Sequence, residues 1–233
     1  MKCALNTRLL SAAELIRQNV ILADIGTDHG YLPIFLLEQG RISHAFCCDI
    51  NEGPLNSARR NAEEAGFTDR MSFVLTDGAA VLSGRGISDY AICGMGGELI
   101  ADIISRAGQL RDPAVRLILQ PMTRQEKLRE YLASEGFKVL SESYSFDAGK
   151  HYVCLLAVYD GRAREITPLE AVAGFSDSEF SGRECRIKYL ENKLRSLERA
   201  AEGKRQSGAD VDADRELTAA LKDYINTLRK DEI

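Results

Sequence analysis

Two aspartates flank a glycine turn near the start of the chain and could bind a cationic ligand. The stretch from Asp24 to Gly30 reads DIGTDHG and follows an apolar run. This pattern predicts a turn between a strand and a helix. Its spacing differs from the G-x-G-x-x-G pattern that holds a pyrophosphate in dinucleotide folds. The carboxylates of Asp24 and Asp28 would repel a pyrophosphate and favour a ligand with an amino group and a sulfonium, which points to S-adenosylmethionine. The alternative is a plain strand-to-helix turn that needs only Gly26.

Two later strand-like runs also end in aspartate. Asp49 ends the second run, where a carboxylate can accept hydrogen bonds from both hydroxyls of a ribose. Asp77 could bond an adenine amino group, and Gly78 would leave room for the ring. The alternatives are a helix cap at Asp49 and an ordinary Asp-Gly turn. Because the carboxyl ends of parallel strands line one crevice, the three strand ends together favour a nucleoside site.

The fourth and fifth strand-like runs end in residues that suit a flat substrate. The sequence GMGG, which begins at Gly94 and includes Met95 and Gly96, would expose backbone N–H groups and let a planar group lie close. Gln120 offers an amide donor and acceptor at the floor of the crevice. Tyr31 and Met95 could stack on a base, although filling the core is the commoner role of methionine.

The elements that must position these residues alternate between strand-like and helix-like runs. Strands are predicted over residues 20–25, 44–49, 71–77, 89–96 and 116–122. Helices are predicted over residues 31–39, 52–65 and 124–135, with another directly after the fourth strand. This alternation is typical of an α/β fold with a parallel sheet covered on both faces. Two further strand-like runs, 137–146 and 151–160, are joined by a short turn and predict an antiparallel hairpin.

The last third of the chain predicts two amphipathic helices that form a coiled-coil-like hairpin. The first helix is predicted from about 177 to 203, and the second follows a polar break. Apolar residues recur at spacings of three and four over 187–201 in the first helix and over 217–228 in the second. A shorter helix should begin at Thr167–Pro168. The chain carries a net charge of −5, yet residues 182–205 hold eight Lys or Arg against four Glu. This local excess predicts contact with RNA phosphates, and a solvated helix face is the alternative.

The segments ADIGTDHGYLP, ICGMGG and LILQPM, with the two-helix tail, resemble the bacterial tRNA (adenine-22-N1)-methyltransferase family. The resemblance extends along almost the whole chain. It implies a Rossmann-like class I methyltransferase sheet with a terminal antiparallel hairpin, and a C-terminal two-helix domain. We expect an S-adenosylmethionine domain over 1–160 and a helical, tRNA-contacting domain over 161–233. The implied reaction is transfer of a methyl group to N1 of the adenosine at position 22 of certain tRNAs.

The resemblance also implies roles for single residues. The cofactor would contact Asp24, Gly26, Asp28, Asp49, Asp77, Gly78 and Gly94. From the residue types and the local positive charge, and not from the resemblance, we expect the tRNA to contact Tyr31, Met95, Gly96, Gln120, Arg186, Lys188, Lys193 and Arg195. Methylation leaves the adenine ring cationic, so a neighbouring carboxylate would stabilise the developing charge. We expect Asp28 to act in this way and His29 to orient it, with capping or packing as the alternative role of His29.

Composition and spacing limit the other functions that this sequence could have. No apolar run approaches the ~18 residues that cross a bilayer, and the first residues lack the pattern of a signal peptide, so we expect a cytoplasmic protein. The cysteines and histidines are not clustered, so no metal site is expected. A small-molecule methyltransferase and a non-catalytic RNA-binding module with the same fold remain open, as does the choice between monomer and homodimer. The missing G-x-G-x-x-G disfavours a nicotinamide dehydrogenase.

Overall fold

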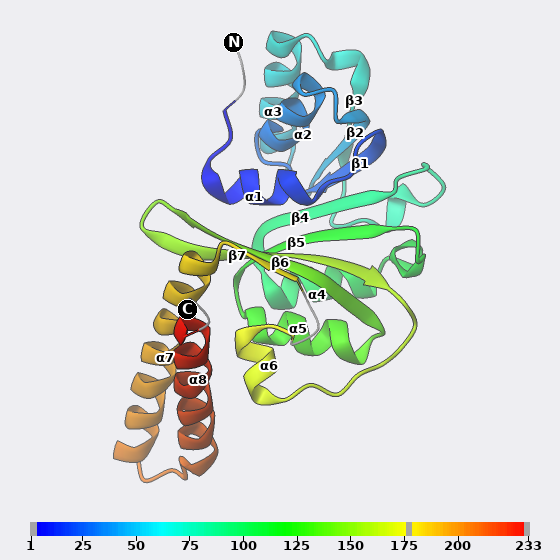
Figure 1. Ribbon diagram of the computed structural model, residues 1–233. Coiled ribbons are helices and arrows are strands. Elements are labelled where there is room, and N and C mark those ends of the chain that lie inside the picture. Colours follow the sequence, from blue (N-terminus) through cyan, green and yellow to red (C-terminus); the bar gives the residue numbers. More distant parts are fainter. Residues whose placement is uncertain (1–3, 176–178, 231–233) are drawn as a thin grey trace.

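The computed structural model describes residues 4–175 and 179–230, and an eight-stranded sheet runs through its centre (Figure 1). The strand order is β3-β2-β1-β4-β5-β7-β6-β8. The strands are β1 (Val20–Ile25), β2 (Ile42–Asp49), β3 (Met71–Leu75), β4 (Asp89–Gly96), β5 (Arg116–Thr123), β6 (Phe137–Asp147), β7 (Lys150–Tyr159) and β8 (Glu179–Ser181). Strands β1 to β5 pair in parallel, and β7 is antiparallel to both β5 and β6. The α/β, Rossmann-like sheet with a terminal hairpin is thus confirmed.

Helices cover both faces of this sheet (Figure 1). They are α1 (Thr7–Leu15), α2 (Tyr31–Glu38), α3 (Glu52–Ala65), α4 (Gly97–Ser105), α5 (Gln125–Ser134), α6 (Pro168–Ala173), α7 (Arg183–Gln206) and α8 (Asp212–Lys230). Successive strand residues point to opposite faces, so Leu22 packs with α1 and α2 while Ala23 packs with α4 and α5. Both faces are therefore apolar, and polar side chains collect at the strand ends.

Helix α1 is an element that we did not expect from the sequence. Its first turn is capped by Asn6, whose side chain accepts a hydrogen bond of 2.9 Å from the Leu9 backbone N–H. Ala12 and Ala13 are fully buried on the sheet face that α2 also covers. The packing of these small residues holds the N-terminal turn of α1 beside the carboxyl edge of the parallel strands.

The long tail helix, predicted to start at about residue 177, begins later among the described residues, and position 177 itself lies outside them. Residues Glu179–Ser181 form β8, which pairs in parallel with β6, and α7 begins only at Arg183. Gly182 turns the chain with a φ of 70°, and a Cβ there would lie 2.1 Å from the Tyr144 carbonyl oxygen. Glycine therefore permits both the left-handed turn and the close approach to β6. The helix also runs to Gln206, past the predicted break at 203.

Helices α7 and α8 form the expected antiparallel hairpin, which projects from the β6 and β7 side of the sheet (Figure 1). Leu190 of α7 and Leu221 of α8 are fully buried in one core with the sheet. Thr167 starts α6 with a capping box to Glu170, which confirms the predicted helix start. A domain boundary after residue 160 stays a prediction. Two elements that follow this residue contact the first part of the chain, because β8 pairs with β6 of the sheet and α6 packs on α5.

Two kinds of feature are absent from residues 4–175 and 179–230. No helix in these ranges is long and apolar enough to cross a membrane. The same ranges contain no group of three or more His, Cys, Asp or Glu side chains placed to hold a metal ion.

Candidate active site

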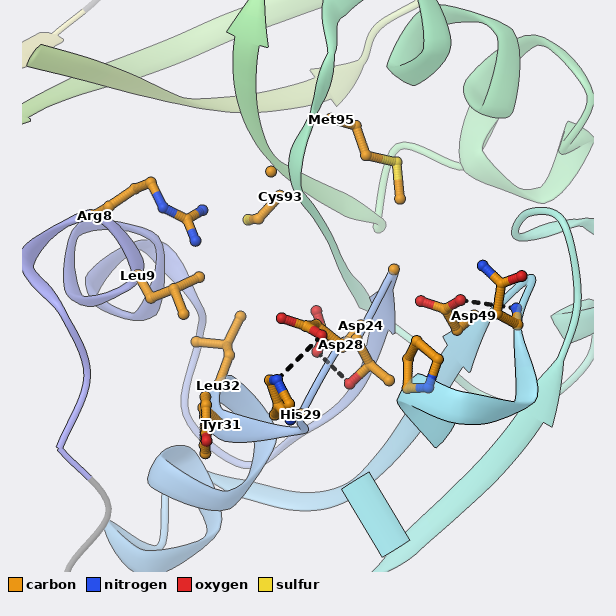
Figure 2. A pocket seen from close by; sticks show the side chains of 15 residues that line it. Arg8, Leu9, Asp24, Asp28, His29, Tyr31, Leu32, Asp49, Cys93 and Met95 are labelled. Carbon is orange, nitrogen blue, oxygen red and sulfur yellow. Dashed lines mark hydrogen bonds and ion pairs between the residues drawn. The ribbon is translucent and has the colours of Figure 1, made fainter. Parts of the chain in front are cut away.

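A cavity of about 390 Å³ opens at the carboxyl edge of the parallel strands, between α1 and the loops after β1, β2 and β4 (Figure 2). A smaller apolar slot of about 110 Å³ lies beside it, at the ends of β2 and β3. The two hollows share Gly26, Asp49 and Met95, so they adjoin, and together they are called the crevice. Its size falls within the range of small-molecule sites. Ten of the predicted site residues line the crevice: Asp24, Gly26, Asp28, His29, Tyr31, Asp49, Asp77, Gly78, Gly94 and Met95.

Asp24 is a buried carboxylate at the base of the cavity. Its Oδ2 accepts a hydrogen bond of 2.7 Å from the Thr27 hydroxyl. Burial, with smaller contributions from Asp28 and Asp49, raises the pKa of Asp24 to about 6, although the Thr27 hydrogen bond opposes the shift. A buried acid with this pKa would gain most from a ligand that brings a positive charge against it.

The turn after β1 needs glycine and places Asp28 in an uncommon conformation. Gly26 has a φ of 77°, and a Cβ on it would meet the Met95 methyl group at 2.2 Å. Asp28 has a φ of 48°, a left-handed conformation that Asp tolerates better than most residues. Its exposed carboxylate lies 3.4 Å from Nε2 of His29, whose ring stacks on Tyr31 with centroids 5.2 Å apart. Asp28, His29 and Tyr31 therefore form one polar and aromatic wall of the cavity (Figure 2).

Asp49 and the neighbouring slot have the chemistry to bind a nucleoside, with the sugar at the carboxylate and the flat ring in the slot. One oxygen of Asp49, Oδ1, accepts a hydrogen bond of 2.8 Å from the Asn51 backbone N–H. The local turn therefore uses this carboxylate, but a carboxylate has further acceptor sites for a ligand. Ile50 and Leu99 are exposed apolar side chains that line the slot. Two such side chains could cover the faces of a planar ring.

Asp77 has a partner that the sequence did not reveal. Its Oδ2 accepts a hydrogen bond of 2.6 Å from Nη1 of Arg106, the residue directly after the C-terminus of α4. A ligand amino group would share this carboxylate with the arginine. Gly78 lines the same slot, and a Cβ on it would make only ordinary contacts, the nearest at 3.7 Å from Ile103. The room that Gly78 leaves is thus modest in the structure.

Gln120 is more enclosed than expected. Its side chain is fully buried and lines neither hollow of the crevice. Its Oε1 accepts hydrogen bonds from Nη1 of Arg8 at 2.6 Å and from the Gly94 backbone N–H at 3.1 Å. The oxygen therefore holds α1 and β4 together. Arg8 lines the cavity in this position (Figure 2). Nothing in the sequence around Arg8 predicts that it would line the cavity.

The GMGG turn brings β4 against the end of β5. A Cβ on Gly97 would lie 2.3 Å from the Arg124 carbonyl oxygen, so only glycine permits this approach. A Cβ on Gly96 would lie 3.3 Å from the Thr123 hydroxyl, and Gly96 lines neither hollow of the crevice. Met95 lies between the cavity and the slot, with its methyl group over Gly26. Met95 is half-buried there and also packs against the core, so its position suits both a packing and a binding role.

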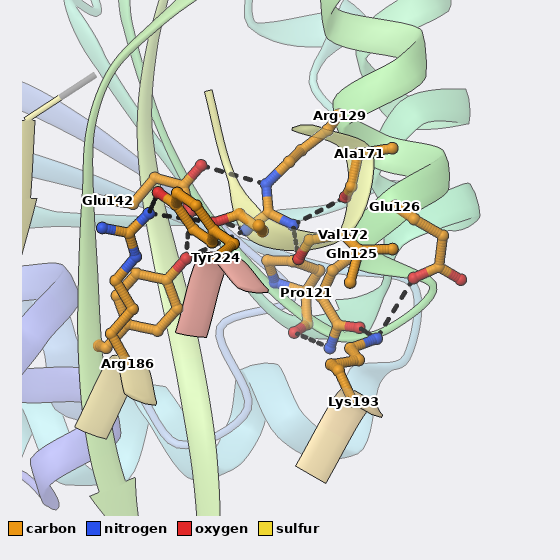
Figure 3. Close-up of polar contacts among 12 residues, drawn as sticks. Pro121, Gln125, Glu126, Arg129, Glu142, Ala171, Val172, Arg186, Lys193 and Tyr224 are labelled. Atoms are coloured by element: carbon orange, nitrogen blue, oxygen red, sulfur yellow. Dashed lines mark hydrogen bonds and ion pairs between the residues drawn. The ribbon is translucent and has the colours of Figure 1, made fainter. Parts of the chain in front are cut away.

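Two of the predicted RNA-binding residues have other partners in the structure (Figure 3). Arg186 is buried: its guanidinium lies over the Phe180 ring at 3.3 Å from the centroid and donates a hydrogen bond of 2.6 Å to the Tyr224 hydroxyl. The Arg186 side chain packs α7 against β8 and α8, so it is not exposed to a phosphate in this structure, and its contact with RNA stays a prediction. Lys193 donates a hydrogen bond of 2.6 Å to Gln125 Oε1 and pairs with Glu126 at 3.3 Å, which ties α7 to the start of α5.

The other two predicted RNA contacts lie on the open side of α7. Lys188 and Arg195 are exposed and seven residues apart, which places them on one face of the helix. Arg199, four residues further, extends this face, which we call the basic stripe (Lys188, Arg195 and Arg199). Lys188 pairs with Glu191 at 3.2 Å, an exposed contact that a phosphate could replace at little cost.

Comparisons with known proteins agree with this architecture. A family model described as a methyltransferase domain matches residues 5–155. The tRNA (adenine(22)-N(1))-methyltransferase of Bacillus subtilis is 29% identical over 97% of this chain and 96% of its own length. A similar solved structure is that of Streptococcus pneumoniae Sp1610, a proposed tRNA (m1A22) methyltransferase, in complex with S-adenosyl-L-methionine. It is 30% identical in sequence, the match covers 94% of this chain and 98% of that chain, and the TM-score is 0.78. The TrmK structure of M. capricolum with S-adenosyl-homocysteine is 27% identical over 97% and 96% of the two chains, with a TM-score of 0.70.

Proposed function

Because this chain belongs to the methyltransferase-domain family, we propose that it transfers a methyl group from S-adenosylmethionine to N1 of adenosine 22 in tRNA. The observation that carries this proposal is the near full-length similarity to tRNA (m1A22) methyltransferases, which extends through the helical tail as well as the sheet. The crevice adds independent chemical support, because carboxylates stand at the ends of three neighbouring strands.

The donor set of the crevice fits S-adenosylmethionine, which supplies a methyl group on a positively charged sulfur. Asp24 would hold the ammonium group of the methionine part, because it is the buried acid of the cavity. Asp49 would accept hydrogen bonds from the ribose, as the carboxylate that both hollows share. The slot between Ile50 and Leu99 would take the adenine, with Asp77 at its rim. Gly26, Gly78 and Gly94 would line the path of the ligand.

The target adenine would enter beside the wall of Asp28, His29 and Tyr31. Its N1 lies on the Watson–Crick edge, so a paired or stacked base must first be turned out. Tyr31 is half-exposed and would stack on the extruded ring, and Met95, which lines both hollows, would contact the ring from the GMGG turn. N1 attacks with its own lone pair, so alignment provides much of the acceleration. As the ring becomes cationic, the Asp28 carboxylate stabilises the charge and can accept the N6 proton.

Replacing Asp28 by Asn should lower kcat by about 100-fold, because it removes the charge that stabilises the cationic ring. Asn tolerates the left-handed backbone of this position as Asp does, so the turn should be kept. Single-turnover methylation of tRNA measures the rate, and calorimetry with S-adenosyl-homocysteine measures binding. Wild-type turnover in this variant would remove Asp28 from the mechanism.

The basic stripe is the part of the tail that we expect to contact tRNA phosphates. Changing Lys188, Arg195 and Arg199 together to Gln should weaken tRNA binding and reduce the slope of log Kd against log salt by about 2 to 3. Fluorescence anisotropy over a salt series measures both quantities. Arg215 and Lys222 on α8 are also exposed and seven residues apart, so their double change to Gln is the matched control. An equal loss in both variants would indicate general charge attraction instead of a docking face.

The reaction itself is tested by nucleoside mass spectrometry of tRNA incubated with the enzyme and S-adenosylmethionine. We expect 1-methyladenosine in the digest, and its loss when adenosine 22 of the transcript is replaced by guanosine. Methyl transfer to a different nucleoside would change the substrate and leave the cofactor assignment intact. Binding of S-adenosyl-homocysteine without any methylated nucleoside would favour a small-molecule substrate, and absence of cofactor binding would favour a non-catalytic RNA-binding module.

A further inference from the structure

A second hollow of about 400 Å³ lies on another face of α1 from the cavity, and we call it the hairpin hollow. Arg8 and Leu9 line the cavity, whereas Thr7 and Leu10 of α1 line the hairpin hollow together with Phe146 of β6. An α-helix with its side chains is about 10–12 Å wide, so the two spaces are about one helix apart. Figure 1 shows the tip of the β6–β7 hairpin beside α1 and the start of α7. A large substrate bound at the cavity can therefore reach this tip.

Two apolar side chains of the hairpin hollow are open to water. Phe146 is 49% exposed and Leu10 is 37% exposed. A single exposed apolar side chain is ordinary, but two on different elements that line one hollow are typical of a binding surface. The Phe146 ring also packs against the His151 ring, with centroids 4.7 Å apart. Nδ1 of His151 lies 3.4 Å from the side-chain nitrogen of Asn192 on α7, so the aromatic pair is supported by the tail.

The polar lining of the hairpin hollow suits a nucleoside better than a phosphate. Hydroxyl groups can both donate and accept hydrogen bonds, as a ribose requires. The hollow has five such side chains, from Thr7, Ser11, Ser143, Ser145 and Ser181. Among the described residues that line it, Glu14 is the one with a charge, and its exposed carboxylate would repel a phosphate.

A cation for the phosphate lies in the adjoining hollow. Lys188 of the basic stripe lines that hollow together with His151, and Cys185 lines both hollows. The aromatic pair therefore lies between α1, which borders the cavity, and the first cation of the basic stripe. A nucleotide bound here would place its base and ribose in the hairpin hollow and a phosphate at Lys188.

We propose that Phe146, supported by His151, stacks on an unpaired base of the bound tRNA, a role that rests on the proposed function. Stacking on an aromatic ring accepts every base, because every base has a π-face, so this contact orients the RNA and does not read its sequence. It holds the tRNA between the cavity and the basic stripe. Phe146 is thus a positioning residue, and its loss should raise the tRNA concentration needed for half-maximal methylation without changing the rate at saturation.

Phe146→Ala should weaken tRNA binding by about 5- to 100-fold, the effect of losing one stacked base. Phe146→Tyr keeps the ring and should bind like the wild-type protein, whereas Phe146→Leu keeps an apolar side chain without a π-face and should bind like Phe146→Ala. Fluorescence anisotropy with a tRNA transcript over a salt series measures Kd. The slope of log Kd against log salt should stay unchanged in all three variants, because no phosphate contact is removed.

Val81→Ala is the matched control, because Val81 is 59% exposed and lines neither the crevice nor the hairpin hollow. It should leave Kd for the transcript unchanged. Calorimetry with S-adenosyl-homocysteine should give the same affinity in every variant. If Phe146→Ala binds tRNA like the wild-type protein, if Phe146→Leu restores binding, or if Phe146→Ala loses cofactor affinity as well, the stacking role is wrong while the proposed function stands. If the wild-type protein does not bind the transcript, the proposed function itself fails, and the stacking role fails with it.

Discussion

Asp24→Asn should weaken S-adenosylmethionine binding by about 10- to 100-fold and, at the same time, stabilise the ligand-free protein. The loss of affinity follows from removing the carboxylate that would face the ligand's ammonium group. The gain in stability follows from burial, because the native state must keep Asp24 ionised at neutral pH in a place that disfavours the charge. Asn can still accept the hydrogen bond from Thr27, so the local turn should persist.

The sign and pH range of the stability effect follow from the two pKa values. Folding raises the pKa of Asp24 from 3.8 to about 6, a change equivalent to about 3 kcal/mol. Below pH 3.8 the group is protonated in both the native and the unfolded state, so it costs nothing. As pH rises to about 6 the unfolded state releases its proton first, and the wild-type protein loses stability through this group. Cofactor binding changes in the opposite direction, since it requires the ionised carboxylate and weakens below pH 6.

Urea denaturation at pH 4 and pH 7.5 measures the stability effect. Asp24→Asn and the wild-type protein should have similar free energies of unfolding at pH 4, and the variant should be more stable at pH 7.5. Asp28→Asn, which alters a mostly exposed carboxylate four residues away, is the matched control and should show a much smaller pH-dependent gain, because it removes only the minor contribution of Asp28 to the raised pKa of Asp24. A variant that is less stable at pH 7.5, or that binds cofactor like the wild-type protein, would contradict the role given to Asp24.

The strand ends could be predicted from the sequence because their signals are local. An apolar run that ends in Asp predicts both a buried strand and an acid at its carboxyl end, and β1 has the predicted bounds of Val20–Ile25. Parallel pairing then brings Asp24, Asp49 and the end of β3 to one edge without further information. Arg8 could not be found in this way, because its place depends on how α1 packs across the sheet.

The tail shows where a charge count misleads. Arg186, Leu190 and Lys193 follow one another at spacings of four and three, so both cations share the face of α7 that is buried. Lys188, Arg195 and Arg199 lie on another face and stay exposed. If the helical period is applied to the cations as well as to the apolar residues, it predicts that Arg186 and Lys193 share the inner face and that Lys188, Arg195 and Arg199 do not. The partners of Arg186 and of the partly buried Lys193, which are Tyr224 and Glu126, depend on tertiary packing and carry no local signal.

A buried ion pair between α5 and β6 should be the most sensitive point for stability. Arg129 and Glu142 are both fully buried, with Nη2 and Oε2 2.7 Å apart, and the Tyr144 hydroxyl donates a hydrogen bond of 2.7 Å to the same carboxylate (Figure 3). Arg129 also donates hydrogen bonds to the carbonyl oxygens of Ala171 and Val172 at the end of α6. This network therefore joins the sheet, α5 and α6, the elements against which the tail packs.

Arg129→Met should lower the free energy of unfolding by about 3 to 5 kcal/mol, because it leaves the Glu142 carboxylate buried without its countercharge. Adding Glu142→Leu should recover part of this loss, since the double variant buries no charge there. Lys127→Met, which breaks an exposed pair with Glu130, is the control and should cost at most about 0.5 kcal/mol. Urea denaturation gives all three values. If Arg129→Met lowers the free energy of unfolding no more than the control does, the ion pair does not hold α6 and the tail to the sheet. The tail would then depend on its apolar core around Leu190 and Leu221.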